Sequence, residues 1–202
     1  MKWTDLVMLT ALLFNSAIFS RNGFACTQDA SPASKSPEVI ARLLAEQGKL
    51  VALPAPKGKV KQIIERNDKA HAFPSGESKA VLFKLPDFTR PYTLKLSSFC
   101  NCSGPSKSVF VPMIVLLDAE FKHVYQLEET DLVSKYESLE ANIKMNAGRK
   151  ADSYLLIYTR GDLVGELLGA LRTFEGLLVR FNYPYFRAAF GSLAIETALP
   201  KK

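Results

Sequence analysis

The sequence contains few of the residues that most often catalyse reactions or bind metal ions. Among its 202 residues are two histidines, His71 and His123, and three cysteines. Neither histidine has a cysteine or a carboxylate at metal-ligand spacing, so we expect both to be surface residues. The sequence also lacks a glycine-rich phosphate-binding loop. We therefore expect a protein without enzymatic activity and without a cofactor.

Two short segments resemble catalytic motifs but are better explained as structural features. Gly76–Ala80 faintly resembles a nucleophile elbow, but a strand is predicted after it, where that motif needs a helix. Asp118 and Glu120 lie close in sequence across a predicted turn, where an aspartate is an ordinary residue. We do not interpret them as the carboxylate pair of a glycosidase.

Basic residues are in excess, but they are not clustered along the chain. The formal net charge is +6, and no run of Lys or Arg is longer than two residues. Aromatic residues do not interleave with basic ones as they do in nucleic-acid-binding surfaces. We interpret the charge as a solubility feature with weak affinity for anionic envelope surfaces, and we expect no nucleic-acid partner.

The first 25 residues have the pattern of a signal peptide. Lys2 gives a positive start, and residues 6–19 are mostly apolar. This run is too short to span a bilayer comfortably. Small residues at Gly23 and Ala25 indicate a cleavage site. We therefore expect export across the inner membrane and a mature chain that begins at Cys26.

Cys26 permits two interpretations of the mature N-terminus. Residues 26–36 are polar and rich in Ala, Ser and Pro, which is the composition of a flexible tether. A cysteine at the first mature position before such a tether is typical of a bacterial lipoprotein attached to the outer membrane. Against this, Gly23 stands where lipoproteins usually have Leu. The alternative is an ordinary secreted protein in which Cys26 is free or paired.

The segment from Ala80 to Tyr125 carries the strongest strand signals. Residues 80–85 form an apolar run before Pro86, and residues 92–97 are apolar at alternate positions. Met113–Leu117 is apolar at every position, as expected for a strand in the middle of a sandwich. Residues 121–127 follow a short turn and are predicted to pair with it as a hairpin.

Two helices and further strands are predicted around this segment. The first helix begins with Ser36 as N-cap and Pro37, ends at Gly48, and is expected to dock on the sandwich edge. The second opens with a capping box at residues 159–162 and continues to Leu171. The further strands are predicted at residues 62–65, 139–145, 154–158 and 192–198. We predict a single domain over residues 37–202, mainly β, with a jelly-roll-like β-sandwich and two short helices.

Two cysteines and two tyrosines are candidates for special roles. Cys100 and Cys102 lie on the same face of an extended segment and can form a small disulfide in an oxidising compartment, or one can bond to Cys26. We expect a structural role for them. Residues 181–186 are predicted to form an aromatic loop, in which Tyr183 and Tyr185 could stack on a sugar ring. The alternative is that these rings cap the sandwich core.

From Phe73 onward the chain resembles the maltose operon periplasmic protein family. The resemblance is carried by Ser78–Val81, Leu85–Pro86, Tyr92–Ser98, Val109–Pro112, Ile114–Asp118, Tyr154–Thr159 with Asp162–Leu163, and Gly191–Leu193. It implies a periplasmic protein associated with maltose and maltodextrin transport, with maltodextrin or envelope transport proteins as partners. The family has no assigned enzymatic activity and no established functional residues. The chain departs from the family pattern in its cysteine pair and its aromatic stretch.

Three hypotheses follow for the function. The first is a non-enzymatic accessory protein of carbohydrate uptake that binds a glucan or a transport component. The second is a lipid-anchored interaction module without affinity for sugar, which Cys26 and its tether suggest. The third is an unrecognised hydrolase, for which we expect no turnover of glycan substrates.

Overall fold

The computed structural model describes residues 33–102, 107–135, 137–174 and 180–200, without the side chains of residues 170–174 and 180–183. The chain divides into residues 1–31 and residues 32–202, and all the described residues belong to the second unit. The predicted signal peptide, Cys26 and most of the predicted tether lie outside the described residues. Within those residues, no helix is long and apolar enough to cross a membrane.

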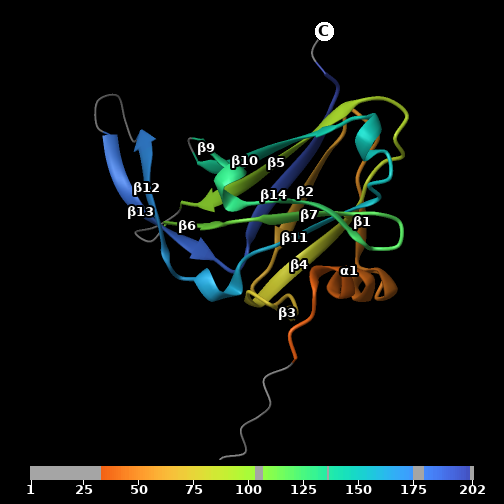
Figure 1. The fold of residues 1–202 in the computed structure, drawn as a ribbon. Coiled ribbons are helices and arrows are strands. Elements are labelled where there is room, and N and C mark those ends of the chain that lie inside the picture. Colours follow the sequence, from red (N-terminus) through yellow and green to blue (C-terminus); the bar gives the residue numbers. More distant parts are fainter. Residues whose placement is uncertain (1–32, 103–106, 136, 175–179, 201–202) are drawn as a thin grey trace, which may run out of the picture. The chain divides into compact units, whose positions relative to one another are not determined.

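The described chain is mainly β, with one α-helix, α1 (Pro37–Glu46) (Figure 1). One sheet contains β1 (Leu50–Ala52), β3 (Ala70–Phe73), β4 (Gly76–Lys84), β7 (Met113–Leu117), β8 (His123–Leu127) and β11 (Tyr154–Tyr158). The other contains β2 (Lys59–Ile64), β5 (Tyr92–Asn101), β6 (Lys107–Phe110), β9 (Val133–Lys135), β10 (Ser138–Met145), β12 (Leu167–Phe174), β13 (Arg180–Ala188) and β14 (Gly191–Ala198). Short 3₁₀ helices lie at Glu129–Asp131, Ala147–Arg149 and Gly161–Leu163. The two sheets pack face to face, which confirms the predicted sandwich.

The six-stranded sheet is built around the apolar strands that the sequence predicts. Its order is β1-β4-β11-β7-β8, with β3 paired to β4. Strand β7 is buried at all five positions, because β11 and β8 flank it and both faces are covered. The antiparallel pairing of β7 with β8 confirms the predicted hairpin.

Strand β5 is the centre of the eight-stranded sheet. One side of β5 pairs with β10, and the other pairs with β14 and, at the end of the strand, with β6. Strand β10 continues to β9, β14 continues to β2, and β6 continues to β13 and β12. Among the described strands, β2, β9 and β12 are therefore edges of this sheet.

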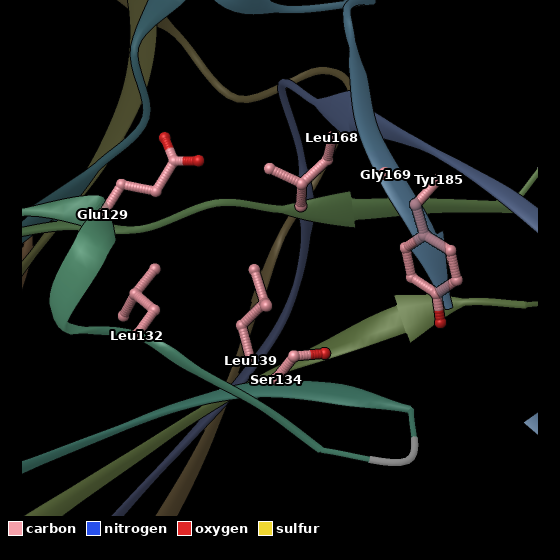
Figure 2. Close-up of a pocket in the computed structure, with 7 residues that line it drawn as sticks. All are labelled: Glu129, Leu132, Ser134, Leu139, Leu168, Gly169 and Tyr185. Atoms are coloured by element: carbon pink, nitrogen blue, oxygen red, sulfur yellow. The ribbon is translucent and has the colours of Figure 1, made fainter. Parts of the chain in front are cut away.

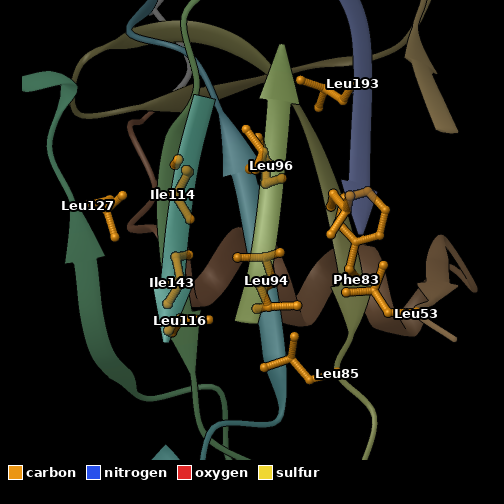
Figure 3. Packing of buried hydrophobic residues seen from close by; sticks show 14 of the residues in the cluster. Leu53, Phe83, Leu85, Leu94, Leu96, Ile114, Leu116, Leu127, Ile143 and Leu193 are labelled. Carbon is orange, nitrogen blue, oxygen red and sulfur yellow. The ribbon is translucent and has the colours of Figure 1, made fainter. Parts of the chain in front are cut away.

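The main core lies between the two sheets. Figure 3 shows side chains of both sheets that point into this space, including Phe83 and Ile114 from one sheet and Leu94 from the other. All three are at most 1% exposed. The alternation of side chains along a strand explains how the six-stranded sheet can also bury its opposite face.

Helix α1 covers that opposite face. Its buried residues Ile40 and Leu44 pack against Leu82, Val115 and other outward-facing residues of the sheet. Ser36 is the N-cap residue and Pro37 follows it, as predicted, while Gly48 adopts the left-handed conformation after the helix. The predicted docking at the sandwich edge is wrong, because the apolar stripe of α1 matches an apolar sheet face rather than an edge.

Two other predictions are wrong in the C-terminal third. The second predicted helix is a single 3₁₀ turn followed by β12, and the predicted aromatic loop is part of β13. Gly165 and Gly169 have φ values of +88° and +145°, which are incompatible with a helix. The Gly165 N–H donates to the carbonyl of Arg187, and the Arg187 N–H donates to the carbonyl of Glu166. These bonds start a β-ladder where the apolar spacing suggested a helix.

Candidate functional site

A pocket of about 290 Å³ lies between strands β9 and β10 on one side and β12 and β13 on the other. Figure 2 shows the side chains that surround it. The lining is mostly apolar, with one carboxylate and two hydroxyl-bearing side chains: Glu129, Leu132, Ser134, Leu139, Leu168, Gly169 and Tyr185. Small-molecule sites commonly combine apolar walls with a few polar groups in this way.

The local geometry of two hairpins creates the pocket. On one side, β9 pairs with β10 so that Ser134 lies opposite Leu139. On the other side, the β12–β13 ladder shifts register between Leu167 and Gly169. Such an irregularity bends a strand and redirects its side chains. Leu168 lies at this shift and closes one wall of the pocket.

Tyr185 is buried in the wall of the pocket. It is 1% exposed, and its hydroxyl lies 3.2 Å from the sulfur of Cys102. The structure joins Cys102 to Cys100 in a disulfide, so the sulfur accepts and the tyrosine hydroxyl donates. Burial, together with the negative charge of Glu137, raises the pKa of Tyr185 to about 12. The ring is thus a neutral, fixed wall rather than an exposed stacking platform.

Tyr183 belongs to β13, two residues before Tyr185, but its side chain is outside the described features. The structure therefore brings together Tyr185, Cys100 and Cys102 from the candidates that the sequence singles out. Their common neighbourhood is a satellite core that also contains Val109, Val111 and Leu139.

An ion pair fixes the polar rim of the pocket. The guanidinium of Arg187 donates to both carboxylate oxygens of Glu129, each at 2.6 Å. The Arg187 side chain is only 12% exposed, and its Nε has no hydrogen-bond partner among the described atoms. Bidentate pairs of this kind are strong and directional. Glu129 is therefore held in one orientation while it still lines the pocket.

The other predicted candidates lie away from this pocket. His71 is on β3 and His123 is on β8, at opposite sides of the six-stranded sheet. Burial and the charges of nearby lysines lower the pKa of His71. Asp118 accepts the N–H groups of Glu120 and Lys122 at 2.9 and 2.8 Å, which is the turn role expected for it. In the described ranges, no cluster of His, Cys, Asp and Glu is placed to hold a metal ion.

Sequence reasoning missed the residues that complete the pocket. Glu129 and Arg187 are 58 positions apart, and no spacing rule connects them. The apolar spacing predicts a helix at Leu168, which lies in strand β12, so its place in a pocket wall could not be predicted. The only sequence signal near Glu129 is a short run of acidic residues before β9.

Residues 75–167 match the sequence model of a family described as maltose operon periplasmic protein precursor (MalM). This match confirms the family resemblance. The MalM name indicates a periplasmic protein associated with the maltose operon, and the family is not a known enzyme family. The matched region includes Glu129 to Leu139 and ends just before Leu168. A search of curated proteins gave no match.

Proposed function

We propose that the protein is a non-enzymatic accessory protein of maltodextrin uptake in the periplasm, and that it binds one glucose unit of a glucan in the pocket beside Tyr185. The observation that carries this proposal is the carboxylate of Glu129, held by Arg187 at the rim of a mostly apolar pocket. The MalM match supports the connection with maltose.

The chemistry of the pocket suits a pyranose ring. A glucose unit has an apolar C–H face and a rim of hydroxyl groups. Leu132, Leu168 and the buried wall formed by Tyr185 can contact the C–H face. The oriented carboxylate of Glu129 accepts hydrogen bonds from sugar hydroxyls, and Ser134 can donate or accept. A volume of about 290 Å³ limits the pocket to one sugar unit and not a longer segment.

Calorimetric titration of the mature protein with a maltodextrin series tests the proposal. We expect saturable heat with maltose and longer glucans. Ser134→Trp, at an exposed position whose side chain lines the pocket, should abolish the heat. Val133→Trp is the matched control, because the adjacent residue of β9 points to the other face. Absence of heat at millimolar sugar, or equal heats for both variants, would contradict the proposal.

A second function is favoured by exposed apolar residues on the two edge strands beside the pocket. Val133 on β9 and Leu167 on β12 are both more than half exposed. Edge strands with exposed apolar residues readily pair with another chain. A membrane-tethered interaction module, anchored through Cys26, would use this surface for an envelope transport protein. Failure of radiolabelled palmitate to enter the protein would contradict the anchor.

A further inference from the structure

Five lysines that are scattered in the sequence meet on the outer face of the eight-stranded sheet. Cross-strand register places Glu196 between Lys59 and Lys95, and places Lys144 beside Thr93. Because side chains alternate along strands, every second residue contributes to this face. We call this surface the lysine face, and its amines belong to Lys59, Lys61, Lys95, Lys135 and Lys144.

The lysine face has an excess of positive charge. The outward carboxylates on the same strands are Glu140 and Glu196, so five amines against two carboxylates leave a charge of +3. Lys135 pairs with Glu140 at 2.5 Å, and Lys95 lies 3.9 Å from Glu196. The other three lysines, Lys59, Lys61 and Lys144, have no ion pair within the described chain and are exposed.

The shape of the lysine face fits a partner with a broad surface. Small residues such as Ser97 and Ala194 form the floor of a hollow of about 280 Å³, and the long lysine and glutamate side chains rise around it. Large apolar side chains share the face: Val133 lies opposite Glu140 and is 54% exposed, and Ile63 and Phe99 flank Ser192 in one cross-strand row. Ile63 and Phe99 are 59% and 39% exposed, respectively.

We propose that the lysine face docks on the surface of an anionic phospholipid bilayer. Lysine amines near such a surface are attracted to the headgroup phosphates, and each adds about fivefold to the binding constant. Exposed apolar residues among them can enter the headgroup region, which is how interfacial proteins combine the two forces. An acidic soluble polymer would use the amines but would leave Ile63 and Phe99 without a partner.

The position of the face in the fold agrees with this proposal. Helix α1 covers the outer face of the six-stranded sheet, whereas the lysine face is the outer face of the opposite sheet. A periplasmic location, which the MalM match supports, places the protein between two membranes. The proposal does not depend on glucan binding, because none of the residues that line the pocket beside Tyr185 contributes an amine to the lysine face.

Vesicle co-sedimentation of the mature protein tests the docking surface. The vesicles contain phosphatidylglycerol and phosphatidylethanolamine, and phosphatidylcholine vesicles serve as the neutral reference. The triple variant Lys59→Gln, Lys61→Gln, Lys144→Gln removes the three amines that have no ion pair within the described residues. The control variant Lys84→Gln, Lys122→Gln, Lys150→Gln removes three exposed lysines that lie outside the eight-stranded sheet.

We expect the native protein to bind the anionic vesicles and to lose affinity as salt is raised. The lysine-face variant should bind about a hundredfold more weakly, since three factors of about fivefold multiply. The control should stay within a few-fold of the native protein. Ile63→Thr should weaken binding at both low and high salt. A lipid anchor at Cys26 would add the same salt-independent affinity to every variant.

The proposal would be overturned if the two triple variants lost equal affinity for anionic vesicles, or if the lysine-face variant kept the affinity of the native protein. Equal binding of the native protein to anionic and neutral vesicles would also overturn it, as would binding to soluble polyglutamate without binding to vesicles. The last result would assign the face to an acidic polymer. The salt dependence of the native protein needs no variant, so it remains informative if a substitution impairs folding.

Discussion

Arg187 and Glu129 connect β13 to the turn before β9, and their pairing is the most specific polar contact at the pocket. We predict that Arg187→Gln lowers the free energy of unfolding by about 2 kcal/mol, because a charge-assisted bidentate contact is lost from a largely buried position. Urea unfolding measures the change. Arg160→Gln is the control, because the guanidinium of Arg160 also donates to both carboxylate oxygens of Asp162, but at a solvent-exposed site.

The control variant should leave stability almost unchanged, because exposed ion pairs contribute little. Equal losses for Arg187→Gln and Arg160→Gln would show that burial does not strengthen the pair at the pocket rim. Glucan affinity should also fall in Arg187→Gln, since Glu129 then loses its fixed orientation.

Asp152 is a buried carboxylate with an incomplete set of partners. Its side chain is 1% exposed, and neither carboxylate oxygen accepts a hydrogen bond among the described atoms. The guanidinium nitrogen Nη1 of Arg149 lies 3.5 Å from Oδ2 of Asp152. Burial raises the pKa of Asp152, and the charge of Arg149 offsets only part of this effect. The folded protein therefore binds the Asp152 proton more tightly than the unfolded chain does.

The sign of the resulting pH dependence is fixed. The contribution of Asp152 to the stability of the folded protein is most favourable below its ordinary pKa of 3.8. This contribution is lost as the pH rises through the raised pKa of the folded state. We predict that Asp152→Asn is more stable than the native protein at neutral pH and that the difference shrinks in acid. Urea unfolding at both pH values measures this. A variant that is less stable at neutral pH would mean that the attraction to Arg149 prevails.

At the scale of single elements, helix α1 is held by one face. Ile40 is fully buried against the six-stranded sheet, whereas the adjacent Val39 is 47% exposed. We predict that Ile40→Ala lowers the free energy of unfolding by about 3 kcal/mol, because it leaves a cavity under the helix. Val39→Ala should have little effect. Thermal unfolding of both variants distinguishes this packing from a loosely attached helix, for which the two losses would be similar.

The elements that the sequence predicts are those in which local pattern and tertiary role agree. Strands β7 and β11 are apolar throughout because they lie in the middle of a sheet with both faces covered. Strand β10 alternates because only one of its faces is in the core. Helix α1 begins with Ser36 and Pro37 and ends before Gly48, so its bounds could be read closely.

The elements that are predicted wrongly depend on pairing between segments that are far apart in the sequence. Residues 163–171 have apolar spacing that also fits a helix, but the partner strand β13 and two glycines with positive φ make a ladder. The predicted aromatic loop at residues 181–186 is instead part of β13, and the pairing of β13 with β6 begins only at Tyr185, so the missing N–H of Pro184 interrupts no bond to that strand. The pocket rim and the lysine face likewise arise from contacts between residues far apart in sequence.

At the scale of the whole domain, the sandwich offers three distinct surfaces. Helix α1 covers one outer face, the lysine face is the other, and the pocket opens where β9 approaches β12. A protein that docked on a membrane through its lysine face would keep the pocket in a separate place, bounded by β9, β10, β12 and β13. A glucan contact and a membrane contact would then lie on separate surfaces of one small domain.

The most direct test of glucan binding is a map of amide chemical shifts during titration of the ¹⁵N-labelled mature protein with maltotriose. We expect saturable shifts concentrated around Glu129, Ser134 and Leu168, with little change on α1. Shifts confined to the lysine face, or no shifts at millimolar sugar, would contradict a glucan site in the pocket beside Tyr185.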